Sequence, residues 1–146
     1  WDWEFNMMKA GTYYVGDLCY VIAAKDWDEV CRLTTRKNKC IQGEFMLADG
    51  RRFAMYTTKW GDGSYYDNKR LNSYCVDSGT IGCILLDDVK ASISATYDNI
   101  EELGAIIEFK EDFETYNNDG LIVFGDVIIN TDPDEFYDEK DEYEYE

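Results

Sequence analysis

Short segments in which apolar and polar residues alternate recur along this chain of 146 residues, separated by glycine, aspartate and asparagine. An alternation with a period of two is typical of β-strands that bury one face. A chain built from many such segments forms antiparallel sheets, with helices in a minor role. We therefore predict a mostly β fold of the α+β type, an antiparallel sandwich or a strongly bent sheet, in a single domain over residues 1–131.

The segment 44–58 predicts a β-hairpin whose register follows from its apolar residues. A two-residue Asp-Gly loop would pair apolar residues with mismatched partners. A three-residue loop that ends at Gly50, with Gly50 in the left-handed conformation, instead places Phe45 opposite Phe53. We predict the three-residue loop because it gathers the apolar side chains of both strands on one face.

Other strands are predicted from the same alternation, at residues 12–15, 19–22, 64–66, 73–77, 80–86, 105–113 and 121–130. The segment 80–86 is apolar on both faces, which predicts a central strand. Gly125 interrupts the most apolar segment, 121–130, and indicates a bulge or a close approach of another backbone. The sequence Asn-Asn-Asp-Gly at 117–120 predicts the turn before it.

One amphipathic helix is predicted over residues 26–37, because apolar and small side chains recur there with helical spacing. Those side chains are Trp27, Val30, Cys31 and Thr34. Asp26 is the expected N-cap, and the basic end of the segment suits the negative helix terminus. A short second helix is predicted over residues 98–103 and is expected to stop at Gly104.

The charge of the chain restricts its partners. It carries 31 acidic and 14 basic residues, a formal net charge of −17, and no histidine. Such a surface repels nucleic-acid phosphates and anionic lipids, so we expect neither nucleic acid nor membrane as a direct partner.

Without histidine, serine and cysteine nucleophiles lack their usual base, and metal sites lack their commonest ligand. We expect a protein or a small ligand as the partner, no catalytic activity and no cofactor.

The two ends of the chain have unusual compositions. Residues 132–146 hold nine acidic residues and one lysine, a net charge of −8 that leaves −9 for residues 1–131. We predict a disordered tail that keeps the protein soluble. Because aromatic residues lie among these acids, two alternatives stay open: an arm that docks on a basic partner, or part of a DNA-mimicking surface that inhibits a nucleic-acid-binding protein.

Residues 1–6 alternate aromatic with polar residues, which predicts an arm that pairs with a sheet edge, including the edge of a second copy in a homodimer.

Five cysteines, none of them in a Cys-x-x-Cys pair, indicate reduced thiols in a cytosolic protein. The N-terminal residues lack the apolar region of a signal peptide. No apolar run approaches the ~20 residues that a membrane-spanning helix needs. We therefore expect a soluble protein with a cytoplasmic location.

The candidate functional site consists of two turns that each carry an aspartate next to glycine or serine, Trp60-Gly61-Asp62-Gly63 and Asp77-Ser78-Gly79. Such turns hold a carboxylate where backbone donors or a cation can reach it. The residues expected to contact a ligand or partner are Trp60, Asp62, Tyr65, Tyr66 and Asp77. We assign no catalytic residue and no metal ligand. Two alternatives stay open: the aspartates only form turns, or, with Asp67 or Asp87-Asp88, they form a carboxylate-based enzyme site or a Ca²⁺ cage.

These two turns and the segment Val15-Gly16-Asp17-Leu18-Cys19-Tyr20 resemble small uncharacterised phage and bacterial proteins. The shared pattern is a Gly-Asp-Gly-x-Tyr turn followed by a Val-Asp-x-Gly segment, here Gly61–Tyr65 and Val76–Gly79. The resemblance covers residues 11–89, and Leu18 stands where those proteins often have proline. It is compatible with a phage-encoded protein and implies no known reaction. We therefore interpret the chain as a small acidic binding or protein-interaction module.

Overall fold

The structure is a computed structural model, and it describes residues 7–69, 72–92 and 103–132. Three of the predictions fall on other parts of the chain. These are the N-terminal arm at 1–6, the helix at 98–103 apart from Leu103, which lies in a turn, and the acidic tail at 132–146 apart from Asp132.

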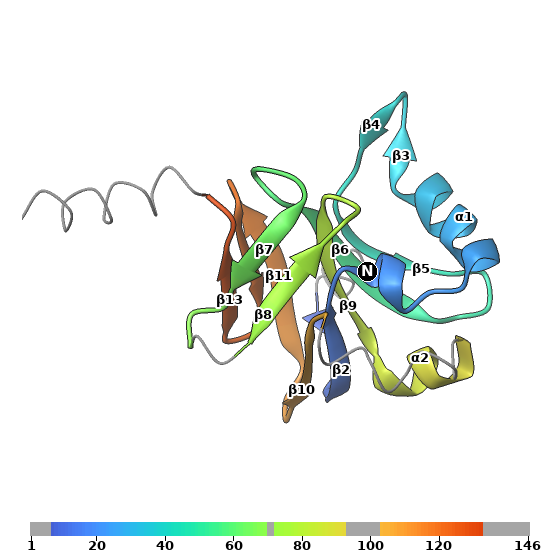
Figure 1. Cartoon of the computed structure of the whole chain (residues 1–146). Helices are drawn as coiled ribbons and strands as arrows, with labels where there is room; N and C mark the ends of the chain where they lie inside the picture. Colours follow the sequence, from blue (N-terminus) through green and yellow to red (C-terminus); the bar gives the residue numbers. More distant parts are fainter. Residues whose placement is uncertain (1–6, 70–71, 93–102, 133–146) are drawn as a thin grey trace, which may run out of the picture.

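A five-stranded antiparallel sheet forms the centre of the molecule (Figure 1). Its strands, in order across the sheet, are β10 (Ala105–Phe109), β2 (Gly11–Gly16), β9 (Thr80–Leu85), β6 (Arg52–Thr57) and β5 (Gly43–Met46). The prediction of a central strand at 80–86 is confirmed by β9, which has two strands on one side and two on the other. Its side chains enter both cores because both faces of the sheet are covered.

A four-stranded antiparallel sheet packs against the first one. Its strands, in order, are β1 (Met7–Met8), β11 (Phe113–Asn118), β12 (Leu121–Phe124) and β13 (Val127–Asn130). The predicted single strands at 105–113 and 121–130 are wrong, because each is divided between two strands. In the second case Gly125 begins a two-residue turn with a φ of +62°, which glycine adopts without a steric cost. The turn predicted at 117–120 is confirmed between β11 and β12.

The core between the two sheets is built from alternate residues of the strands, as the period-two pattern requires. Tyr13 lies there with its ring edge-on to Phe109 and Phe113, at centroid distances of 5.7 and 5.1 Å. The next residue of the same strand, Tyr14, faces the opposite side of the sheet and belongs to the second core. The central sheet therefore has a sheet on one face and helices on the other (Figure 1).

The helical layer consists of α1 (Ala24–Leu33), α2 (Leu86–Ser92) and the short 3₁₀ helix η2 (Leu18–Tyr20). The predicted helix at 26–37 is shifted: α1 starts two residues earlier and ends at Leu33. Asp26 is not its N-cap; that position belongs to Ala23, and the Asp26 carboxylate pairs with Arg51 at 2.9 Å. No helix in the described ranges is long and apolar enough to cross a membrane.

Two small hairpins complete the fold. They are β3 (Thr35–Arg36) with β4 (Lys39–Cys40), and β7 (Gly63–Tyr66) with β8 (Ser73–Val76). The β7–β8 hairpin confirms the strands predicted at 64–66 and 73–77, and it attaches to β13 through a bridge between Asp67 and Ile129.

The register predicted for the 44–58 hairpin is confirmed. Phe45 lies opposite Phe53, with the two rings stacked 5.4 Å apart. Gly50 ends the three-residue loop with a φ of +99°. The strand predicted at 19–22 is wrong, because η2 occupies its first half. The side chain of Asp17 accepts a hydrogen bond from the Cys19 amide and so favours a turn there.

Candidate functional site

Two neighbouring loops carry the aspartates that the sequence indicated as candidates. The loop 58–62 connects β6 to β7, and the loop 77–79 connects β8 to β9. Because β6 pairs with β9 and β7 pairs with β8, both loops cross from the central sheet to the same small hairpin. The amide of Thr58 donates to the carbonyl oxygen of Gly79 at 3.0 Å, which joins the loops directly. Segments well separated in sequence therefore form one surface.

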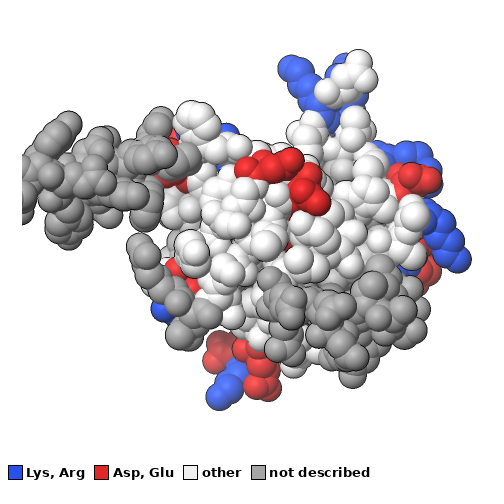
Figure 2. All heavy atoms as spheres, in the orientation of Figure 1, with Lys and Arg blue, Asp and Glu red and all other residues white. Residues whose placement is uncertain are grey.

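Asp62 and Asp77 directly follow the last paired residues of the β7–β8 ladder on this surface. Gly63 pairs with Val76 at the end of this ladder, and Asp62 and Asp77 are the next residues along the two chain segments, just beyond the paired positions. Both side chains are exposed. Figure 2 shows acidic side chains on this side of the molecule, over the loops before β7 and after β8.

Cys19 and Tyr20 lie beside this acidic pair. Burial raises the pKa of the Cys19 thiol most, and the hydrogen bond with Asp17 and the charges of Asp17, Asp77 and Asp62 raise it further. Burial and the charge of Asp77 raise the pKa of Tyr20 to about 12. Both groups are therefore protonated at neutral pH. The thiol is not an activated nucleophile, since only the thiolate reacts readily.

Asp17 connects the loop that carries Asp77 to the turn at Cys19. Its side chain is fully buried. One carboxylate oxygen accepts from the amides of Asp77 and Ser78, both at 2.7 Å, and the other accepts from the Ser78 hydroxyl at 2.8 Å and the Cys19 amide at 3.0 Å. Asp17 thereby fixes the backbone that carries Asp77. The sequence pointed to its segment only through the resemblance and did not indicate this role.

Asp67 is also buried and structural. Its carboxylate accepts from the Tyr74 hydroxyl at 2.8 Å, the Asn72 amide group at 3.2 Å and the Lys69 backbone amide at 3.1 Å. These partners hold the loop between β7 and β8. Asp67 is therefore not a free ligand that could join Asp62 in a cation cage.

The remaining acids of the Ca²⁺ alternative lie elsewhere in the fold. Asp87 and Asp88 are in the first turn of α2, and burial raises the pKa of Asp88. Within the ranges that the structure describes, no group of three or more Asp, Glu, Cys or His residues is placed to hold a metal ion. Calcium normally takes six to eight oxygen ligands. The site is thus a pair of carboxylates and not a cage.

The aromatic candidates have three different environments. Trp60 is 55% exposed in the same loop as Asp62. Tyr65 is half-buried against the core between the sheets, and its hydroxyl donates to the carbonyl oxygen of Gly61 at 2.9 Å. Tyr66 is 57% exposed at the far end of β7, roughly 13 Å along the strand from Asp62 at ~3.3 Å per residue. Only Trp60 accompanies the acidic pair as an exposed ring.

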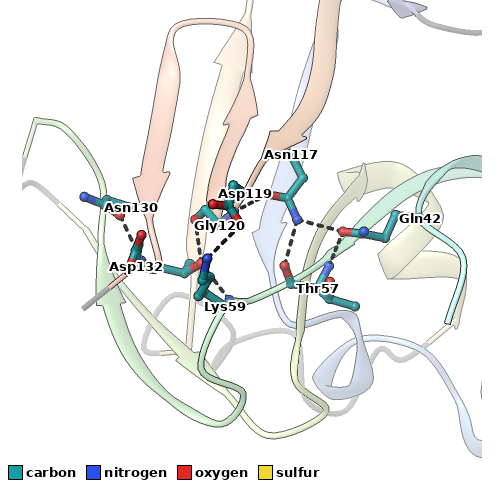
Figure 3. Close-up of polar contacts among 9 residues, drawn as sticks. Gln42, Thr57, Lys59, Asn117, Asp119, Gly120, Asn130 and Asp132 are labelled. Carbon is teal, nitrogen blue, oxygen red and sulfur yellow. Dashed lines mark hydrogen bonds and ion pairs between the residues drawn. The ribbon is translucent and has the colours of Figure 1, made fainter. Parts of the chain in front are cut away.

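A polar network anchors the start of the Trp60 loop to the four-stranded sheet (Figure 3). The backbone amide of Lys59 donates to the Thr131 hydroxyl at 3.0 Å, and its ammonium group pairs with Asp119 at 2.7 Å. Nearby, the side-chain amide of Asn117 donates to the Thr57 carbonyl oxygen at 2.8 Å. The partners in each of these contacts are sixty residues or more apart, so no local pattern indicated the network.

Three comparisons with known proteins, against family models, curated proteins and solved structures, found no match for this chain.

Proposed function

We propose that this chain is a non-catalytic protein-binding module that holds a basic side chain of its partner between Asp62 and Asp77. The observation that supports the proposal is the β7–β8 register, in which these two exposed carboxylates directly follow the last pair, Gly63 with Val76. Their mutual repulsion is relieved when a cation lies between them.

An arginine or lysine side chain fits this arrangement. Carboxylates and guanidinium groups form charge-assisted hydrogen bonds that are stronger than neutral ones, and arginine can engage two oxygens at once. Trp60 is exposed in the same loop as Asp62, two residues before it, and we propose that its ring contacts the same cation. Cation–π contacts of this kind operate within about 6 Å of the ring centre. The geometry supports recognition of one basic residue next to an apolar contact.

The chemistry around the pair supports binding more than catalysis. Both acids are exposed to water, where a charged side chain of a partner can reach them. The neighbouring Cys19 thiol is protonated at neutral pH. The buried carboxylates Asp17 and Asp67 are engaged by backbone and side-chain donors.

The proposal is tested by calorimetric titration of the whole chain with a tri-arginine peptide. In D62N/D77N we expect a loss of affinity of at least tenfold, about 1.4 kcal/mol. The matched control is D28N/D87N, which removes two exposed aspartates from α1 and α2 and changes the net charge equally. The control should lose less than twofold. Because both side chains are exposed, D62N/D77N should also unfold at a urea concentration close to that of the wild type.

Two results would count against the proposal. If both double variants lose affinity to the same extent, the peptide responds to overall charge and not to this site. If Ca²⁺ raises the melting temperature of the wild type and not of D62N/D77N, the pair belongs to a calcium site instead.

A further inference from the structure

The β3–β4 hairpin carries a concentration of positive charge on an otherwise acidic protein. We call residues 35–40, together with Arg32 at the adjoining end of α1, the basic hairpin. Its cations are Arg32, Arg36, Lys37 and Lys39. No acidic residue occurs between positions 30 and 43, so this segment has a formal charge of +4 and the rest of the chain has −21. The hairpin projects from the body in Figure 1, and Figure 2 shows basic side chains at its tip without an acidic neighbour on the visible side.

These cations are not neutralised by the fold. All four side chains are exposed. Other basic residues of the described chain form ion pairs: Lys9, Arg51, Arg52, Lys59 and Lys69. Among the described residues, no ion pair involves a member of the basic hairpin. The hairpin therefore presents free cations to solvent.

The hairpin also has local costs that its own packing does not offset. Arg36 lies directly opposite Lys39, and facing like charges destabilise a strand pair. Its two-residue turn places Lys37 at a φ of +54° and Asn38 at +65°. Such turns favour asparagine or glycine, and lysine is costly in the left-handed region. All six residues from 35 to 40 are exposed, so burial gives no compensation. Departures from local preference of this kind are typical of functional segments.

We propose that the basic hairpin binds a short acidic segment of a partner protein. This surface is distinct from the pair of Asp62 and Asp77, and the proposal goes beyond the function proposed above. An anion between Arg36 and Lys39 relieves their repulsion and gains charge-assisted hydrogen bonds. Electrostatic attraction at physiological salt extends over a Debye length of about 8 Å, so the cations of the hairpin act on a nearby anion more than acids beyond that distance do.

The length of the hairpin decides between an acidic peptide and a nucleic acid. The two paired residues of each strand span about 7 Å at ~3.4 Å each, which matches roughly two residues of an extended peptide. A nucleic acid carries regularly spaced phosphates far beyond that length and would meet the −21 charge of the rest of the chain. A short acidic peptide extends less far beyond the hairpin, so it meets less of this repulsion.

The test is fluorescence anisotropy with a labelled octa-glutamate peptide and, separately, a labelled ten-base-pair DNA duplex. In R36S/K39S we expect at least a tenfold loss of affinity for octa-glutamate. The matched control K25S/K110S also removes two exposed cations, which form no ion pair within the described residues, and it should lose less than twofold. The exchange variant R36K/K39R keeps both charges and should bind within threefold of the wild type. D62N/D77N should bind octa-glutamate at least as tightly as the wild type, which separates this proposal from the previous one.

Three results would overturn the proposal. The first is tighter binding of the wild type to the duplex than to octa-glutamate, which would assign the hairpin to nucleic acid. The second is an equal loss of affinity in R36S/K39S and K25S/K110S. The third is the absence of octa-glutamate binding by the wild type at physiological salt.

Discussion

Replacing Asp17 by alanine tests whether the loop that carries Asp77 depends on one buried carboxylate. Asp17 accepts four hydrogen bonds, from the amides of Cys19, Asp77 and Ser78 and from the Ser78 hydroxyl. A buried donor that loses its partner costs about 1–3 kcal/mol. Asp77 and Ser78 are exposed residues, so water replaces part of the loss. We expect Asp17→Ala to lower the free energy of unfolding by about 3–5 kcal/mol, a large part of the ~5–15 kcal/mol of an ordinary domain.

The assay is urea unfolding at neutral pH, followed by tryptophan fluorescence. The denaturant slope should stay unchanged, because the variant exposes the same surface on unfolding. Asp17→Asn should cost less than Asp17→Ala, since one side-chain oxygen still accepts hydrogen bonds. The control is Asp77→Ala, which removes an exposed carboxylate and leaves the Asp77 amide in place. A loss below about 1 kcal/mol in Asp17→Ala, or an equal loss in Asp77→Ala, would refute the structural role of Asp17.

Two further predictions concern the packing of the sheets. Burial raises the pKa of Glu44 above its ordinary value of 4.5, against the opposing effects of Thr115 and Arg52. The folded chain therefore holds this proton more tightly than the unfolded chain. The free energy of unfolding of the wild type, relative to that of Glu44→Gln, should fall as the pH rises from about 4 to 7. Urea midpoints of both proteins at the two pH values check this, and a relative rise for the wild type would contradict it. In Gly82→Ala the added methyl group would lie 2.2 Å from the carbonyl oxygen of Ala54. This overlap between β9 and the backbone of β6 should lower the free energy of unfolding by about 3 kcal/mol, measured by urea unfolding. An unchanged midpoint would show that the two strands separate locally at little cost.

The charged groups of this protein are separated by role as well as by sign. Asp17 and Asp67 are buried and hold loops through donors from the backbone and from side chains. Asp62 and Asp77 are exposed to water beyond the end of the β7–β8 ladder, and the cations of the basic hairpin are exposed without ion pairs among the described residues. Net charge, which averages over all of these groups, conceals the basic hairpin. This is why an argument from −17 alone favours basic partners and overlooks acidic ones.

The sequence alone determined the local features whose causes lie within a few residues. The three-residue loop at Gly50, with its pairing of Phe45 and Phe53, followed from apolar matching and from the conformational freedom of glycine. The central position of β9 followed from its two apolar faces. In each case short-range sterics and the period of two leave few alternatives.

The tertiary structure decided which distant segments meet, and therefore which aspartate is buried and which is exposed. Asp17, Asp62, Asp67 and Asp77 look alike in the sequence, since each lies near a turn. Asp17 became structural because donors about sixty residues away surround it, whereas Asp62 and Asp77 stayed in water at the end of a ladder. The burial of a carboxylate depends on donors brought by the rest of the chain, and no local pattern encodes their arrival.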